Sequence, residues 1–158
     1  MTDSQTAQEI RGVLIQVGGG RLLLPNATIS EVLSFADPEP IADAPAWLLG
    51  RIRWRGWQLP LVAFGTLAGI ADERGGLGSK VIVLKSLAGT GQLPYFALLT
   101  QGFPRLVTVS QQSLQVADSQ DDLPPGVHSR VRLGEDDALL PDLAALEAMI
   151  DEALAQAA

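Results

Sequence analysis

The chain has no cysteine, one histidine and few aromatic side chains, and these scarcities exclude several kinds of chemistry. Without cysteine there is no disulfide framework, zinc knuckle or thiol nucleophile. His128 would have to be the base of any Ser-His-Asp triad, yet no Gly-x-Ser-x-Gly turn accompanies it. We therefore expect His128 to be a surface or half-buried strand residue.

Long hydrophobic runs are also missing. No stretch reaches the roughly 18 apolar residues of a membrane span, and the opening "MTDSQTAQEIRG" has neither the basic start nor the apolar run of a signal peptide. We expect a cytoplasmic protein in which residues 1–10 form a mobile tail and residues 11–158 form a single domain.

The glycine-rich and acidic stretches form no recognisable catalytic motif. The segment "GGLGSK" (75–80) is similar to a phosphate loop, but Ser79 breaks the required Gly-Lys order and an apolar strand follows in place of a helix. Asp121-Asp122 and Asp136-Asp137 are adjacent pairs in loops, and adjacent side chains face apart on an extended chain. The sequence thus predicts no enzyme, no metal site and no cofactor.

Charge is unevenly distributed along the chain. The net charge is −7, and more than half of the acidic residues lie from Asp118 onward. Against this background the segment "GRIRWRGWQLPLVAF" (50–64) concentrates Arg51, Arg53 and Arg55 beside two tryptophans. Such a local excess of positive charge can orient a charged partner.

The remaining pattern is typical of a β protein. Short apolar or alternating segments separated by Gly and Pro predict around nine strands, beginning with a hairpin of residues 12–17 and 21–25. Residues 141–156 differ, because their apolar side chains recur at helical spacing and predict one amphipathic helix. We expect a mainly β fold of two small barrels with a C-terminal helix that packs through Leu143, Leu146, Ile150 and Leu154 and leaves Glu147, Asp151 and Glu152 in water.

Residues 50–64 are predicted to be a hairpin. A period of two points Arg51, Arg53 and Arg55 to one face, while Ile52 and the core residue Trp54 point to the other. Arg55-Gly56 is the predicted turn, and Pro60 in the return strand indicates a sheet edge or a bulge, because proline donates no ladder hydrogen bond.

Two long segments, "LLLPNATISEVLSF" and "ADAPAWLLGRIRWRGWQLPLVAFGTLAGI", together with the closing "ALLPDLAAL", resemble the CheW-like coupling family of bacterial chemosensory arrays. The shared features are Glu31-Val32 at the end of a strand, Pro45 in the following loop, Gly50, the Arg55-Gly56 turn, and an apolar return strand leading to a short helix. They follow one another in the family's order over most of the chain.

The resemblance implies two interlocked five-stranded SH3-like barrels and a non-catalytic adaptor. Its implied partners are the cytoplasmic tip of a chemoreceptor and the regulatory domain of a CheA-type histidine kinase, so that the protein is recruited to membrane-associated receptor arrays. By the same resemblance Ile29, Glu31 and Arg55 lie on the receptor-facing surface, with Gly50 and Gly56 shaping its turns. Arg51 and Arg53 extend the patch if they are not simply solvated.

The sequence departs from the family at a few positions. Ala63 stands where the family usually has an acid, Trp54 replaces a leucine, and Thr100-Gln101-Gly102 replaces an Asp-x-Val pattern. An accessory CheW-like protein of a type IV pilus system is therefore an alternative to a standard flagellar coupler. Two other classes remain open: a nucleic-acid-binding small barrel that uses the Arg and Trp side chains, which the acidic total opposes, and a small hydrolase with paired carboxylates.

Overall fold

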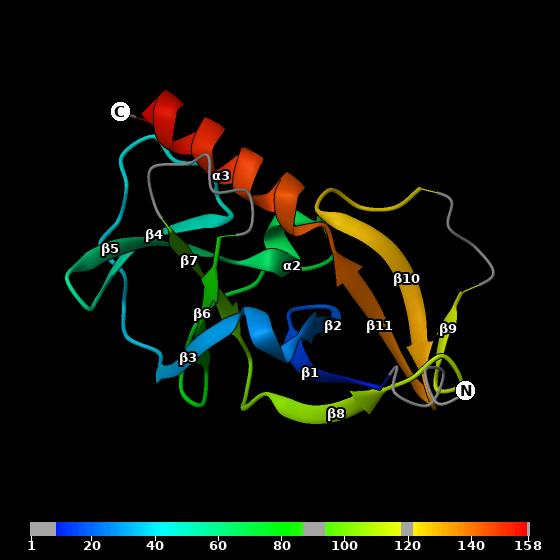
Figure 1. Ribbon diagram of the computed structural model, residues 1–158. Coiled ribbons are helices and arrows are strands. Elements are labelled where there is room, and N and C mark those ends of the chain that lie inside the picture. Colours follow the sequence, from blue (N-terminus) through cyan, green and yellow to red (C-terminus); the bar gives the residue numbers. More distant parts are fainter. Residues whose placement is uncertain (1–8, 87–93, 118–121, 158) are drawn as a thin grey trace.

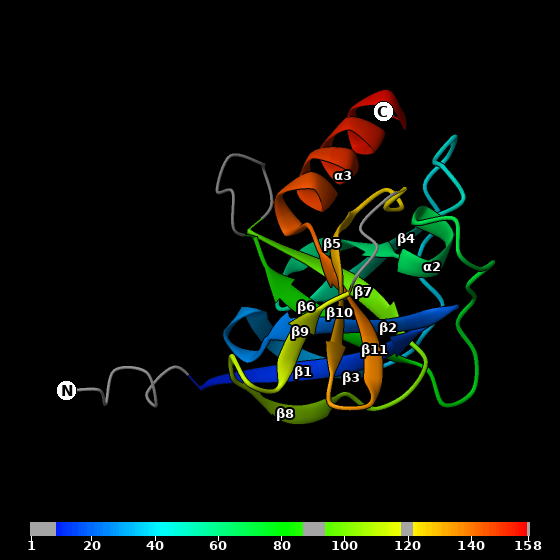
Figure 2. The ribbon, with the colours of Figure 1, turned by 90° about the vertical axis from the view of Figure 1, so that its right-hand side faces the viewer.

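A computed structural model describes residues 9–86, 94–117 and 122–157, which form two β-sheets side by side with one long helix along them (Figure 1). The view turned by 90° shows the same helix standing over the strands (Figure 2). Residues 1–8 lie outside the described part, so the mobile tail stays a prediction, and the first strand already begins at Ile10.

The first sheet combines strands from both halves of the chain. Its spatial order is β8 (Arg105–Val109), β1 (Ile10–Val17), β2 (Gly20–Pro25), β11 (Asp136–Pro141), β10 (Val127–Leu133) and β9 (Leu114–Val116). The hairpins β1–β2 and β10–β11 are antiparallel, and they meet in a parallel pairing at Leu22 and Leu139.

The second sheet consists of the strands between these two hairpins. Its spatial order is β3 (Ile29–Ser34), β6 (Lys80–Lys85), β7 (Tyr95–Thr100), β5 (Trp57–Val62) and β4 (Leu48–Trp54). A short 3-10 helix, η1 (Asn26–Thr28), leads into β3, and α2 (Phe64–Leu67) follows β5. Because the chain leaves the first sheet after β2 and returns to it at β8, the two sheets are interlocked.

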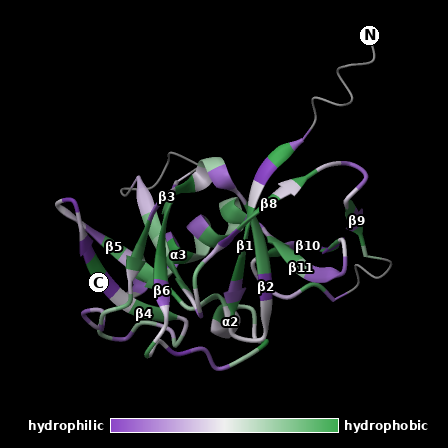
Figure 3. Ribbon diagram, turned by 90° about the horizontal axis from the view of Figure 1, so that it is seen from below, coloured by the Kyte–Doolittle hydropathy of each residue, from purple (hydrophilic) through white to green (hydrophobic). Residues whose placement is uncertain are grey.

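Three apolar regions explain why the chain folds in this way. One cluster, around Leu14, Leu23 and Val131, lies inside the first sheet, and a second region, around Leu59, Leu61 and Val81, lies inside the second. The largest cluster takes side chains from both sheets, α2 and the C-terminal helix. Figure 3 shows the corresponding pattern, with hydrophobic strands and more hydrophilic loops. The central strands β6 and β7 are therefore buried on both faces over most of their length, as "VIVL" in β6 is, whereas β3, β8 and β9 are more exposed.

The mainly β prediction of two interlocked subdomains with a terminal helix is confirmed, with eleven strands in the described residues. The first sheet has six strands rather than five because the short β9 pairs with β10. β9 escaped prediction since its three residues, Leu114–Val116, are too few to show a periodicity.

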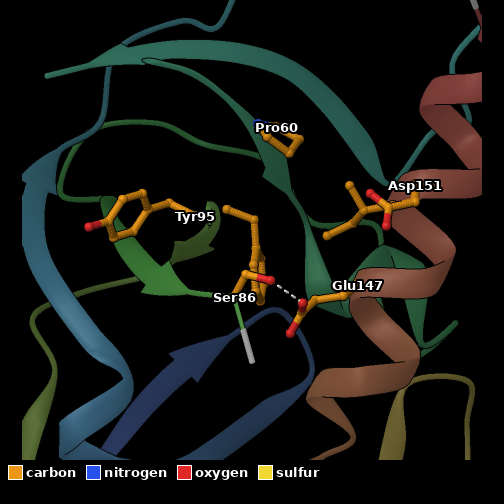
Figure 4. A pocket seen from close by; sticks show the side chains of 7 residues that line it. Pro60, Ser86, Tyr95, Glu147 and Asp151 are labelled. Atoms are coloured by element: carbon orange, nitrogen blue, oxygen red, sulfur yellow. Dashed lines mark hydrogen bonds between the residues drawn. The ribbon is translucent and has the colours of Figure 1, made fainter. Parts of the chain in front are cut away.

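The C-terminal helix α3 (Leu143–Ala157) packs on the central cluster through Leu143, Leu146 and Ile150, as predicted. Asp142 caps it, since its Oδ1 accepts a hydrogen bond from the Ala145 N–H at 3.0 Å. The prediction that Glu147 is solvated is wrong. Glu147 is buried and accepts a hydrogen bond from the Ser86 hydroxyl, because its position on the helix faces the end of β6 (Figure 4).

Candidate functional site

The site is built on the tight β4–β5 turn. Arg55 and Gly56 occupy its two central positions with φ values of +49° and +83°. Both values are positive, as the hairpin turn whose twist matches the flanking strands requires. The predicted Arg55-Gly56 turn is confirmed. Arginine rarely adopts positive φ, so the surrounding contacts must fix this residue.

Those contacts come from Trp54 and Glu31. The Arg55 guanidinium carbon lies 4.8 Å from the centroid of the Trp54 ring, and one guanidinium nitrogen lies 3.1 Å from Glu31 Oε1. The arginine side chain nevertheless stays 69% exposed. Arg55 is therefore oriented by its neighbours while most of its donors face water.

Glu31 joins the two edge strands of the second sheet. Besides the Arg55 contact, its Oε1 accepts a hydrogen bond from the Trp54 indole N–H at 3.0 Å. Glu31 lies on β3 and Trp54 on β4, so this carboxylate bridges the first and the last strand in the order of the five-stranded sheet. The register of β3 with β6 shifts between Ile29 and Glu31, and this bulge sets the direction of the Glu31 side chain.

The tryptophan under Arg55 is part of the core, as predicted. Trp54 is 6% exposed, and its ring meets Tyr95 edge-on at 4.8 Å between centroids. One neighbour is a cation and the other an aromatic ring, so Trp54 is not available to stack on a nucleobase. Sequence reasoning missed Tyr95, because no local signal connects β7 with the β4–β5 turn.

The predicted common face of the three arginines is wrong. Arg51 pairs with Pro60 and Arg53 with Gln58 across the hairpin, so these two arginines share the outer face of the sheet. Arg55 leaves that alternation because the positive φ of the turn redirects its side chain onto Trp54. The arginine patch therefore consists of two adjacent parts, Arg51 with Arg53 and Arg55 by itself, rather than one row.

Gly50 has a different role from the predicted one. It lies inside β4 rather than in a turn, with φ of +148°, next to a register shift between Leu48 and Gly50. The backbone of Glu39 approaches so closely that a Cβ on Gly50 would lie 2.3 Å from the Glu39 carbonyl oxygen. Glycine is therefore required where residues 38–40 pair with the edge of β4.

Pro60 lies in an interior strand, because β5 has neighbours on both sides in the sheet. The expectation of a sheet edge is therefore wrong for the strand as a whole. The described pairing of β5 with β7 begins only at Leu61, so the proline precedes that ladder. The N–H that proline lacks is therefore not needed for pairing with β7.

Exposed apolar residues are neighbours in sequence of the Arg55 turn and its partner: Trp57 follows Gly56, and Val32 follows Glu31. Val32 on β3 and Trp57 on β5 are among the exposed large hydrophobic residues. Ile29 is half-buried and packs against the central cluster, so most of its apolar surface is used inside the protein. The turn therefore combines an oriented cation with flanking apolar area, which is the composition of a protein-binding hot spot.

The carboxylates do not converge into a hydrolytic or metal site in the described residues. Asp136 pairs with Arg105 at 2.7 Å and Asp137 with Arg132 at 3.4 Å, so these acids serve ion pairs. In residues 9–86, 94–117 and 122–157, no group of three His, Asp or Glu side chains could hold a metal ion. Asp121 lies outside those residues. His128 is exposed on β10, as predicted, with its Nδ1 2.6 Å from the Ser129 hydroxyl.

The phosphate-loop likeness also fails in three dimensions. Lys80 is the first residue of strand β6, as the sequence predicts, and its ammonium nitrogen lies 4.4 Å from the centroid of the exposed Phe103 ring.

Among the described helices, none has both the length and the hydrophobicity to cross a lipid bilayer.

Comparison with known proteins gives two findings. Residues 11–150 match the family described as the CheW-like domain. The structure is similar to that of the scaffolding protein TtCheW from Thermoanaerobacter tengcongensis, with a TM-score of 0.70 and 15% sequence identity over 85% of this chain and 89% of that one. No curated protein sequence matched the chain.

Proposed function

The chain belongs to the CheW-like domain family, and from that premise we propose that it is a non-catalytic adaptor of bacterial chemosensory signalling. The proposed partners are the cytoplasmic tip of a chemoreceptor and the regulatory domain of a CheA-type histidine kinase. The adaptor would act in the cytoplasm, at receptor arrays. The fold supports this proposal because the interiors of both sheets are packed with side chains. A partner can therefore bind only at the surface.

The observation that carries the proposal is the oriented, exposed Arg55. Its guanidinium is fixed by Trp54 and Glu31, yet it retains donors for a carboxylate or carbonyl of a partner. Because the turn fixes the backbone, little further conformational entropy is lost on binding. We assign the receptor to this surface.

A coupling protein also needs a second surface that the first partner leaves open. Phe103 is 77% exposed and lies beside Lys80, at the end of the β6–β7 hairpin opposite Tyr95. A six-residue strand spans roughly 17–20 Å, so this end is well separated from the Arg55 turn. We propose that the kinase domain uses this second end.

Of the departures from the family pattern, Trp54 contacts Arg55, whereas Ala63 and Thr100 lie in the interior. Ala63 and Thr100 are fully buried, and the Thr100 hydroxyl donates to the Gly102 carbonyl oxygen at 2.5 Å. Neither residue alters the Arg55 surface. The proposal therefore retains coupling activity for this chain, and it applies equally to a flagellar coupler and to an accessory protein of a pilus system.

The test is the charge reversal Arg55→Glu. Arg55 forms an exposed ion pair, which contributes only about 0–1 kcal/mol, and the repulsion between the new carboxylate and Glu31 is screened to a similar size, so the free energy of unfolding should fall by about 2 kcal/mol at most. Affinity for a receptor-tip fragment should fall by about 2–5 kcal/mol, because the variant loses the forked bond and adds repulsion. Calorimetry with the receptor fragment and with the kinase domain measures both affinities.

Arg74→Glu is the matched control, because Arg74 is also exposed and paired with an acid, Asp72, but lies in another loop. It should leave both affinities unchanged. Equal receptor binding by parent and Arg55→Glu would remove the turn from the site, and loss of folding would make Arg55 a structural residue.

A further inference from the structure

The second sheet has a seam between its two edge strands. In the described residues no ladder joins β3 to β4; one local tie links β4 to β3 and another links β4 to the loop after β3. At one end Glu31 binds Trp54 and Arg55, and at the other Glu39 and Arg51 exchange backbone hydrogen bonds of 2.9 and 2.8 Å. Between the ties the edges of β3 and β4 are not paired with each other.

An open groove occupies this gap. Its volume is about 280 Å³, and its floor contains Leu33, Ile52 and Val81, which belong to the interior of the second sheet. Arg51 and Arg53 line it on the β4 side, and Asp37 and Glu39 line it on the other. We call this groove, between the Glu31 and Glu39 ties, the seam slot.

The arginines of the seam slot are available for a partner. In the described part of the chain neither Arg51 nor Arg53 has an ion pair. By contrast the structure pairs other arginines with acids, namely Arg21, Arg55, Arg74, Arg105 and Arg132. Two unpaired cations beside an apolar floor, in a chain of net charge −7, indicate a place for an apolar group next to a carboxylate.

The size of the groove limits its occupant. Small-molecule and cofactor sites usually measure about 300–1,000 Å³, so the seam slot lies just below that range. One or two side chains of a protein partner fit this volume better. On a helix, residues three or four positions apart share a face, so an apolar residue and an acid at that spacing could reach the floor and the arginines together.

We propose that the seam slot receives an apolar side chain of an acidic amphipathic helix, with the helix's carboxylate on Arg51 and Arg53. This inference rests on the proposed function, because the helix would belong to the receptor hairpin that contacts Arg55. Asp37 fixes the direction in which the helix binds, since a helix carboxylate placed on the Asp37 side of the groove would be repelled. The slot thus supplies specificity that the Arg55 turn alone lacks.

The first test fills the slot from its rim. Ala36 is exposed and lines the groove, so Ala36→Trp covers the floor without entering the core. Ala42→Trp adds the same side chain at an exposed position of the same loop that is not part of the lining. Ala36→Trp should weaken binding of the receptor-tip fragment by about tenfold or more, as loss of a hot-spot contact does, and Ala42→Trp should not.

The second test removes one positive charge. Arg53→Gln should weaken receptor binding by about tenfold, whereas Arg74→Gln, which also neutralises an exposed arginine, should leave it unchanged. Binding that is sensitive to Arg55→Glu but not to Ala36→Trp or Arg53→Gln would overturn the seam slot and leave the adaptor function standing. Failure of the parent protein to bind either fragment would overturn both.

The occupant is tested by a fluorescent probe. The chain has no cysteine, so Ala36→Cys can carry a single environment-sensitive dye, with Ala42→Cys as the control. The receptor fragment should shift the emission of the dye at position 36 to shorter wavelength and leave the control unchanged. The same shift with octanoate alone, and none with the receptor fragment, would assign the slot to a small amphiphile and refute a protein side chain.

Discussion

Glu73 should be the most sensitive acidic residue of the fold. It is 3% exposed, and its carboxylate accepts three hydrogen bonds: from the Gly18 N–H at 2.7 Å, the Gly65 N–H at 2.8 Å and the Gln101 side-chain amide at 2.8 Å. These donors belong to the β1–β2 turn, to α2 and to the residue after β7. One side chain therefore connects both sheets.

The size of the effect follows from counting acceptors. In Glu73→Gln the new amide oxygen can keep the two donors that now share Oε2, but the amide nitrogen would then face the Gly65 N–H. An unsatisfied buried donor costs about 1–3 kcal/mol, and the lost desolvation penalty of the carboxylate offsets part of that. We expect Glu73→Gln to cost about 1–2 kcal/mol. Glu73→Ala leaves all three donors unpaired and should cost roughly 3–5 kcal/mol.

Urea unfolding at constant pH measures both losses, with Glu135→Gln and Glu135→Ala as controls at an exposed turn position. The controls should stay within about 0.5 kcal/mol of the parent protein. If Glu73→Ala were no more destabilising than Glu135→Ala, the carboxylate would not connect the sheets, and the reasoning would be refuted.

Further outcomes follow from the packing. Leu146→Ala should cost about 2–5 kcal/mol in the same urea assay, because the side chain is fully buried under α3, and a parental midpoint would mean that the helix is not docked. Gly50→Ala should destabilise the protein far more than Gly56→Ala, because a Cβ meets the Glu39 carbonyl at Gly50 but nothing within 4 Å at Gly56; equal losses would contradict that contact. Calorimetry with magnesium and ATP should give no heat, and micromolar binding abolished by Lys80→Ala would show that residues 75–80 form a nucleotide site after all.

Local patterns in the sequence predicted most of the strands and the turn at Arg55-Gly56. These features depend on the alternation of neighbouring residues and on glycine, which any single sequence displays. The helix α3 was predicted for the same reason, but Glu147 was assigned to water. Its burial depends on Ser86, which is distant in sequence, and a periodicity carries no information about such a partner.

The candidate site shows the same limit of prediction from local sequence patterns. Alternation correctly placed Trp54 in the core, but it assigned Arg55 to the face of Arg51 and Arg53. Continuing a period of two through a turn ignores the positive φ that the turn itself requires. The role of Gly50 could not be predicted either, because it depends on the approach of Glu39 from another segment.

The internal ion pair of Arg55 competes only weakly with a partner, as the magnitudes of the two interactions show. The Arg55 and Glu31 side chains are 69% and 38% exposed, so their attraction is screened and contributes at most about 1 kcal/mol. A forked bond to a partner carboxylate forms in a site from which water is excluded, where removing one member costs about 2–5 kcal/mol. The same contact with Glu31 and Trp54 also restricts the rotamers of Arg55 before binding. The pair therefore orients the arginine at a small energetic cost to recognition, and Glu31→Gln should weaken receptor binding less than Arg55→Glu does.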